Sequence, residues 1–274
     1  MRKNPFSIYL IAFNISNLCY IWLSLFPLFF NQILNINPTT YNLSYCRFYY
    51  YLSYILNMLC PSFLILASID RVLISSPNAL TRQKSTRRLA FILLILVTFL
   101  WFIYYCQYLF RINMNILVGP IPICYFDLGD YSLYVNYSAI VLGLIPPILL
   151  SICALKTFQN LHRDRFLEGN ENQNRQITQN NRQLIRMLFV EILIDVVCTI
   201  IQPIVLSYLF TTIYVVKSSQ QRNIESFILN VSNFLSYVPN CTSFYCNISC
   251  SKKFRKRLMT TFRKTNEVRT LQEN

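Results

Sequence analysis

The sequence predicts an all-α fold, a polytopic membrane helix bundle with six transmembrane helices. Three observations predict it. Hydrophobic residues make up 54% of the 274 residues and charged residues only 13%, where a soluble domain typically has about 25% charged residues. Long apolar runs recur along the chain, each near or above the ~20 residues that a helix needs to cross a bilayer. These runs are too long for the strands of a membrane β-barrel, and they lack the required alternation.

Six apolar runs are expected to be the transmembrane helices of one membrane domain, which spans residues 1–274. The runs cover about 5–30, 46–76, 88–110, 132–157, 184–211 and 224–247. Lipid offers no water to backbone groups, so each run is expected to satisfy them as a helix. Five prolines inside the runs are expected to kink helices between packed neighbours. They are Pro27, Pro61, Pro147, Pro203 and Pro239.

The net charge of +14 is compatible with a nucleic-acid partner, but the positions of the charges favour another explanation. With the N-terminus in the cytoplasm, 21 of the 25 Lys and Arg residues lie in segments that the six runs leave on the cytoplasmic side. Such a bias is typical of membrane proteins. We therefore expect a multi-pass plasma-membrane protein with both termini cytoplasmic and with no nucleic-acid partner.

The first run has an alternative interpretation as a secretory signal, because Arg2 and Lys3 precede it. Polar residues such as Asn14 and Ser16 interrupt the run, and no small-x-small cleavage site follows it. We therefore expect a transmembrane helix here. Further along, the polar stretch 158–183 is expected to be a flexible cytoplasmic loop.

The composition also argues against most enzyme classes. The chain has four glycines, no glycine-rich phosphate-binding motif, and a single histidine, His162. Nucleotide cradles and His-rich zinc sites therefore have no support. We expect no enzymatic activity, no cofactor and no metal.

Two features near the C-terminus point to contact with membrane lipid. Residues 251–264 place apolar side chains such as Phe254 on one helical face, surrounded by Lys and Arg. An amphipathic helix of this kind is expected to lie along the inner leaflet, next to anionic lipid, and a solvated basic tail is the alternative. Cys246 and Cys250 are candidate palmitoylation sites.

The ten cysteines divide by their expected position. Eight lie inside spans or at the cytoplasmic edge, where thiols stay reduced. Cys46 and Cys124 both lie on the side derived as extracellular, so we expect a disulfide between them. Two free buried thiols are the alternative.

The second run carries the most specific motif in the chain. Cys46 opens it, and 25 residues later it ends in Ser-Ile-Asp70-Arg71-Val72. These residues resemble the rhodopsin-like (class A) family of G-protein-coupled receptors, whose Asp-Arg-Tyr motif follows a cysteine at this spacing. At about 1.5 Å per residue, such a helix carries Cys46 and Arg71 to opposite faces of a membrane. Cys124 matches the partner cysteine of the family's second extracellular loop.

The resemblance extends along nearly the whole chain. Trp101 matches the tryptophan of the fourth family helix, Pro147 or Pro146 the proline of the fifth, and Pro203 that of the sixth. By this alignment the six runs match helices two to seven of the seven-helix receptor fold, and the family's first helix has no counterpart.

Four positions depart from the family pattern. Val72 replaces the motif tyrosine, and Ile201 stands where the sixth helix usually has tryptophan. Asn17 replaces the family's aspartate on the second helix, so that a sodium site between the helices loses its charge. Asn240 to Tyr245 replaces the Asn-Pro-x-x-Tyr motif, and Tyr245 is the candidate match for its tyrosine.

The resemblance implies a receptor that senses an extracellular ligand and signals to a heterotrimeric G protein. In the family, the sixth helix swings about its proline and the motif arginine becomes exposed to the G protein. Asp70, Arg71, Pro203 and Tyr245 are therefore the expected coupling residues, with Asp70 as the resting partner of Arg71.

Polar residues inside the spans are further candidates for functional residues. Carboxylates within a membrane are costly to bury, so they usually mark a functional site. Glu191 and Asp195 lie four residues apart on one helical face, and Asn17 is the interhelical polar residue of the first run. The two carboxylates either hold Arg71 or another base, or are neutral and hydrogen-bonded within the bundle. We favour the second interpretation, because neighbouring carboxylates disfavour each other's ionisation.

The expected ligand is a peptide. Ser53 stands where amine receptors of the family carry an aspartate, so a biogenic amine is disfavoured. Aromatic residues, including Tyr54 and Tyr105, gather at the outer ends of the spans, where a peptide can stack; an interfacial aromatic belt is the alternative. Asn42-Leu-Ser44 is a glycosylation sequon in an outer loop.

Two other functions remain open at this point. A small transporter or channel subunit is one, although we find no internal repeat between residues 1–130 and 131–274. A truncated receptor copy that does not signal is the other, and the unmatched first family helix favours it.

Overall fold

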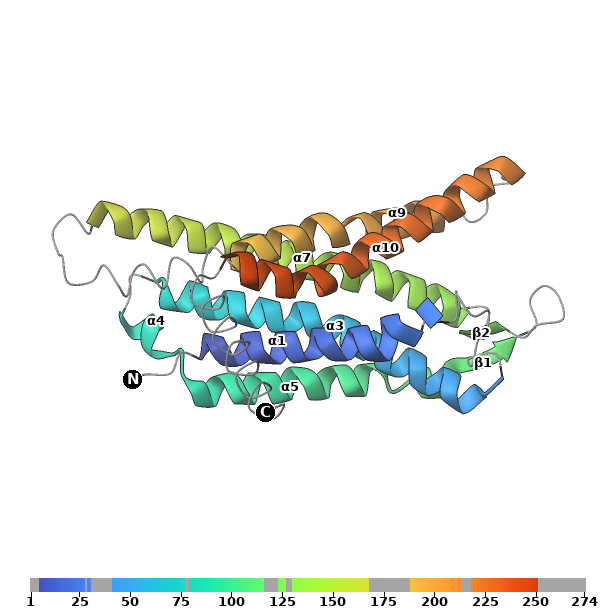
Figure 1. Cartoon of the computed structure of the whole chain (residues 1–274), viewed down its shortest axis with the longest axis horizontal. Coiled ribbons are helices and arrows are strands. Elements are labelled where there is room, and N and C mark those ends of the chain that lie inside the picture. The colour runs from blue at the N-terminus through green and yellow to red at the C-terminus, as the bar shows by residue number, and fades with distance from the viewer. Residues whose placement is uncertain are drawn as a thin grey trace, which may run out of the picture.

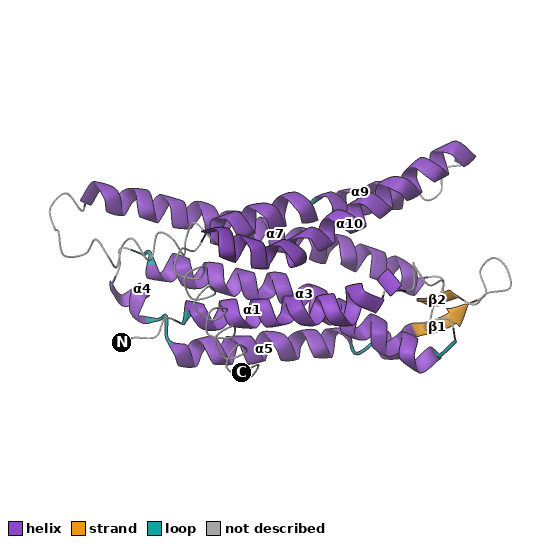
Figure 2. Cartoon of the chain, in the orientation of Figure 1, coloured by secondary structure: helices purple, strands orange, loops and turns teal. Residues whose placement is uncertain are grey.

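The computed structural model describes residues 5–27, 29–30, 41–76, 79–115, 123–126, 130–167, 188–212 and 218–250. Long helices lie side by side in a bundle, and one two-stranded hairpin is placed at one end (Figure 1, Figure 2). The elements are α1 (Phe6–Tyr20), a π-helical turn η1 (Ile21–Leu25), α3 (Leu43–Ile74), α4 (Ala79–Gln83), α5 (Arg87–Tyr105), α6 (Tyr108–Arg111), β1 (Ile112–Asn115), β2 (Ile123–Phe126), α7 (Asp130–Leu167), α9 (Ile201–Thr211) and α10 (Ser219–Cys250).

Five helical segments of the described chain are long and apolar enough to cross a membrane. They are Phe6–Leu25, Leu43–Ile74, Arg87–Arg111, Leu133–Asn160 and Leu188–Leu209. The predicted polytopic helix bundle is therefore confirmed. The sixth predicted run, 224–247, lies within α10 but is not among these five. Its polar side chains, such as Asn230 and Asn233, lower its hydropathy.

The polar stretch that follows the fourth run differs from the prediction. The helix α7 does not end near residue 157 but continues to Leu167. Apolarity predicts where a helix enters lipid, not where its backbone hydrogen bonding ends, so the apolar run marks only part of α7. The predicted amphipathic segment 251–264 lies outside the described residues.

Capping residues explain where two of the helices begin. The Asn42 side chain accepts a hydrogen bond from the backbone N–H of Tyr45 (3.1 Å) at the start of α3. Thr86 accepts one from Leu89 N–H (3.3 Å) at the start of α5. Each cap satisfies a backbone donor that the first helical turn leaves without a partner.

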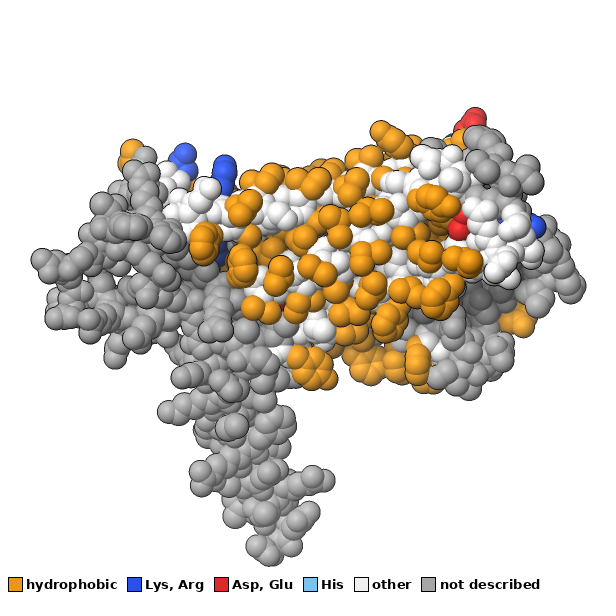
Figure 3. All heavy atoms as spheres, turned by 90° about the horizontal axis from the view of Figure 1, so that it is seen from above, with side chains coloured by type: hydrophobic (Ala, Val, Ile, Leu, Met, Phe, Trp, Pro, Cys, Tyr) orange, Lys and Arg blue, Asp and Glu red, His pale blue; other side chains and the backbone are white. Residues whose placement is uncertain are grey.

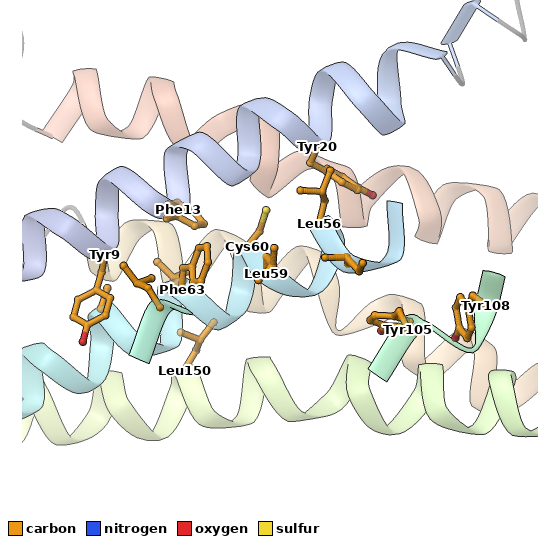
Figure 4. Packing of buried hydrophobic residues seen from close by; sticks show 14 of the residues in the cluster. Tyr9, Phe13, Tyr20, Leu56, Leu59, Cys60, Phe63, Tyr105, Tyr108 and Leu150 are labelled. Atoms are coloured by element: carbon orange, nitrogen blue, oxygen red, sulfur yellow. The ribbon is translucent and has the colours of Figure 1, made fainter. Parts of the chain in front are cut away.

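The central helix of the bundle is α3, which contacts α1, α5, α6, α7 and β1. Between α1 and α3, the side chains of Phe13, Leu59 and Phe63 fill the interhelical space (Figure 4). Apolar side chains also cover the outside of the bundle in its middle part, while charged side chains lie near its ends (Figure 3). An apolar surface in the middle of the bundle is what a hydrocarbon environment favours.

The hairpin is joined to α3 by a covalent bond and by an arginine. Cys46 at the start of α3 forms the predicted disulfide with Cys124 of β2, which pairs with Met114 of antiparallel β1. Arg47 donates from Nε to the Ile112 carbonyl and from Nη2 to Asn113 Oδ1, both at 2.8 Å. The hairpin is thereby held over one end of the bundle.

Removing the disulfide is expected to destabilise the protein. The bond joins residues 78 apart. Closing such a loop lowers the conformational entropy of the unfolded chain, which typically raises the free energy of unfolding by about 2–4 kcal/mol. We expect Cys46→Ala to lower the thermal midpoint in detergent by about 5–10 °C. Cys106→Ala, which removes an exposed free cysteine, is the control and is expected to leave the midpoint unchanged. Equal midpoints for the two variants would contradict the prediction.

Candidate functional site

The two ends of the bundle hold different candidate residues. The hairpin end carries the disulfide and the aromatic side chains around Tyr54. The opposite end, which we call the α4 end, carries the start of α1, the end of α3 and the short helix α4 (Figure 1). Asp70 and Arg71 lie at this second end, near the C-terminus of α3.

The guanidinium of Arg71 is buried at the α4 end. Only 2% of the Arg71 surface is exposed, and its Cζ lies 3.5 Å from the centroid of the Phe6 ring in α1. Phe6 itself is fully buried. A guanidinium over an aromatic face is attracted by the ring quadrupole, by about 2 kcal/mol when the pair is desolvated. Within the described residues, Arg71 Nε and Nη2 have no hydrogen-bond acceptor, and the Phe6 ring covers the guanidinium.

The neighbouring carboxylate is held by a different residue. Asp70 is buried, and its Oδ1 accepts a hydrogen bond of 2.5 Å from the hydroxyl of Ser85. Ser85 lies in the short connection between α4 and α5. The expected resting pair between Asp70 and Arg71 is not among the hydrogen bonds and ion pairs of the described chain. Adjacent residues of a helix project about 100° apart, so the two side chains reach different neighbours.

The proline of the expected moving helix lies against a glycine. Pro203 is buried in α9, and a Cβ built on Gly143 of α7 would lie 3.3 Å from the Pro203 Cβ. A side chain at position 143 therefore requires Pro203 to shift by a few tenths of an ångström. The residue before Pro203, Gln202, donates from Nε2 to Asn233 Oδ1 of α10 at 3.0 Å. The segment around Pro203 thus contacts both of its neighbours closely.

The intramembrane polar residues all lie inside the bundle. Glu191 and Asp195 are buried on the helix Leu188–Leu209. Asn17 is buried on α1, and in the described part of the chain neither of its amide atoms has a hydrogen-bond partner. None of the three contacts Arg71 by a described hydrogen bond or ion pair.

At the hairpin end, the three expected ligand-pocket residues lie in two groups. Ser53 accepts a hydrogen bond of 2.7 Å from Ser24, which the π-helical turn of the first span carries. Tyr54 packs edge-to-face on Tyr108 (4.9 Å between centroids) and against Phe126 of the hairpin (6.1 Å). Tyr105 lies beside Tyr54 but is only 2% exposed. Tyr105 therefore supports Tyr54 from behind and offers little surface to a ligand.

The remaining coupling residue lies apart from Arg71. Tyr245 is near the end of α10, and its side chain is 68% exposed, so it faces away from the bundle interior. The side chains of Cys246 and Cys250 and the segment around Phe254 lie outside the described part of the chain. The structure thus brings Arg71, Asp70, Phe6 and Ser85 together, and leaves Tyr245 outside this group.

The comparison with protein families agrees with this arrangement of helices, disulfide and buried arginine. A model of the family described as "7 transmembrane receptor (rhodopsin family)" matches residues 1–243. The chain belongs to this receptor family. The match covers α1 to most of α10, and the family consists of receptors and not of enzymes. Among curated proteins, none matches the chain.

Two residues of the receptor's α4-end group have no sequence signal of their own. Phe6 is one of 21 phenylalanines, and nothing in its neighbourhood marks it as a contact of Arg71. Ser85 follows Arg82 and Lys84, and its sequence neighbourhood is typical of a solvated loop. Both become visible only when α1 and the connection before α5 are packed against the end of α3.

The hydrogen bond between Ser85 and Asp70 is expected to stabilise the α4 end. A buried carboxylate that loses its donor costs about 1–3 kcal/mol. We expect Ser85→Ala to lower the thermal midpoint, and Ser85→Thr, which keeps a hydroxyl, to lower it less. In an Asp70→Ala background the effect of Ser85→Ala is expected to disappear, as a double-mutant cycle measures directly. Additive effects of the two substitutions would contradict the contact.

Proposed function

We propose that this receptor senses an extracellular ligand and transmits its binding to a heterotrimeric G protein at the α4 end. The observation that carries the proposal is the buried position of Arg71. The Nε and Nη2 atoms of this cation have no acceptor among the described residues, and the Phe6 ring that covers the guanidinium offsets part of the cost of burying a charge. Any movement that separates α1 from the end of α3 turns this guanidinium toward water and toward a partner.

In the proposed mechanism, Arg71 lies under the Phe6 ring in the resting state, and Asp70 accepts the hydrogen bond from Ser85. An agonist favours a second arrangement in which the helix that contains Pro203 moves relative to α7 and the α4 end opens. A ligand shifts such an equilibrium only by its difference in affinity for the two states. The contacts of Arg71 and Asp70 therefore determine how strongly the resting state is populated without ligand.

The proposal includes α10 as a sixth transmembrane helix, matching family helix seven. The distribution of its side chains supports this placement. Phe234 is 69% exposed, and Phe227, Ile228 and Val231 are also exposed, whereas Ser232 is only 1% exposed. Apolar side chains facing outward, with Ser232 facing the bundle, are an arrangement that lipid favours.

With six crossings, we propose that both termini are cytoplasmic and that the receptor lies in the plasma membrane. The supporting observation is the charge distribution, since the connections at the α4 end carry Lys84, Arg87 and Arg88. This bias favours a cytoplasmic α4 end. The hairpin and the sequon at Asn42 then face the outside.

We propose a peptide as the ligand. Ser53 and Tyr54 lie near the hairpin end, where the hairpin packs on Tyr54 through Phe126. The surroundings of Ser53 supply hydroxyl groups, such as that of Ser24. Such a surface suits peptide backbone and aromatic side chains better than a small protonated amine.

The coupling role of Arg71 is tested by variants with opposite expected effects. Removing the ring in Phe6→Leu takes away a contact of about 1–2 kcal/mol, so we expect basal G-protein activation to rise by roughly tenfold. Arg71→Ala is expected to abolish activation, alone and together with Phe6→Leu. The measurement is G-protein dissociation in cells, normalised to the amount of receptor at the surface.

Phe13→Leu is the matched control, since Phe13 is buried in the same helix, whereas the Arg71 guanidinium lies over the ring of Phe6. It is expected to leave basal activation unchanged. If Phe6→Leu and Phe13→Leu behave alike, the contact with Arg71 has no role in coupling. If no condition, including a panel of peptides, gives a response that depends on Arg71, the chain does not couple to G proteins.

A further inference from the structure

One serine in the connection between α4 and α5 lies between a buried carboxylate and the solvent. Ser85 is half-buried, and its hydroxyl donates to Asp70 Oδ1 at 2.5 Å. The residues on either side of it along the chain, Lys84 and Thr86, are exposed. The hydroxyl of Ser85 therefore marks the boundary between the end of α3 and the surface of the α4 end.

The sequence around this serine is strongly basic. Four cations lie within three residues of it: Arg82, Lys84, Arg87 and Arg88. The sequence contains no Asp or Glu between Asp70 and Asp127, so the basic charge is not balanced along the chain. A protein kinase with an acidic substrate cleft attracts such a segment by charge complementarity. Arg82 stands three residues before Ser85, where kinases of this kind bind an arginine.

We propose that Ser85 is phosphorylated by a protein kinase that selects basic residues before its acceptor. The Ser85 oxygen forms a bond to the γ-phosphorus of ATP, the bond from that phosphorus to the bridging oxygen breaks, and ADP leaves. The hydroxyl proton passes to a base of the kinase. A cytosolic kinase reaches Ser85 only where the α4 end faces the cytoplasm, and in this respect the inference rests on the proposed function.

The phosphate removes the hydrogen bond that holds Asp70. A phosphoserine has no hydroxyl proton to donate and carries a charge of about −1.5 to −2 at neutral pH. Asp70 is only 4% exposed, and its Oδ2 has no hydrogen-bond partner among the described residues. A phosphate beside this buried carboxylate is repelled by it. Residue 85 therefore leaves the end of α3 when it is modified.

The start of α5 offers the phosphate a more favourable position. Arg87 and Arg88 lie in the first turn of α5 and are exposed, as is Lys84 next to Ser85. Cations and a helix N-terminus both attract a phosphate. The modification thus exchanges a contact with α3 for contacts at the start of α5. Under the proposed function, the modified receptor populates the resting arrangement less than the unmodified one.

The first test is phosphorylation of the purified full-length receptor in detergent, with ATP and the catalytic subunit of cyclic-AMP-dependent protein kinase. Tandem mass spectrometry locates the phosphate. We expect phosphate on Ser85 and a strongly reduced amount on Ser85 in Arg82→Ala. Asp70→Ala frees the hydroxyl, so the initial rate at Ser85 is expected to rise by about fivefold. Thr86→Asn, which keeps a capping side chain for α5, is the matched control and is expected to leave this rate unchanged.

The second test measures the structural effect of the phosphate. The phosphorylated receptor is expected to unfold about 3–6 °C below the untreated receptor. Ser85→Ala treated with the same kinase is the control for phosphate on other residues, and its midpoint is expected to stay constant. Asp70→Asn keeps the size of the side chain but not its charge, so there the phosphate is expected to lower the midpoint less.

Absence of phosphate from Ser85 in both the receptor without substitutions and Asp70→Ala would overturn the proposal. Phosphate confined to Thr86 in this segment would also overturn it. An equal fall of the midpoint with and without the Asp70 charge would contradict the loss of the contact with Asp70. Neither test requires signalling, and in detergent the kinase reaches both ends of the bundle. Failure of this inference is therefore distinguishable from failure of the proposed function.

Discussion

The helix α3 is fixed at both of its ends, and most other features of the structure depend on this constraint. At one end the disulfide of Cys46 and the hydrogen bonds of Arg47 hold the hairpin. At the other end Asp70 bonds to Ser85 and Arg71 lies under Phe6. Between the ends, α1, α5 and α7 pack around α3. A change at the hairpin is therefore connected to the arginine by one continuous, packed helix.

Polar groups inside the bundle follow from the same surroundings. A lipid-facing surface is mostly apolar, and several polar side chains of α10 and of the helix Leu188–Leu209 are buried, among them Glu191, Asp195 and Ser232. Others contact neighbouring helices, as in the bond between Gln202 and Asn233. The interior of the receptor thus combines an apolar core with a small number of buried polar side chains.

The sequence is sufficient to predict the helices, the membrane environment and the disulfide, because apolar length and cysteine position depend on local composition and sidedness. It also predicts Asp70 and Arg71 as a pair of interest. It does not predict their partners, since Phe6 and Ser85 come from segments far along the chain and carry no motif. The end of α7 at Leu167 and the outward position of Tyr245 also escape prediction, because helix length and rotation are set by packing. Nor does the sequence predict that Asn57, Gly143, Asp195 and Asn240 line one cavity, because they come from four different helices.

The central claim is that the Phe6 ring covers the Arg71 guanidinium in the resting receptor. Nuclear magnetic resonance of the receptor with ¹⁵N-labelled arginine tests it most directly, with Arg71→Lys used to assign the signal. A guanidinium above an aromatic ring is shielded by the ring current, so the account predicts an upfield Arg71 Nε–H resonance that moves to an ordinary position in Phe6→Leu. An Arg71 resonance at an ordinary position, unchanged by Phe6→Leu, would contradict it.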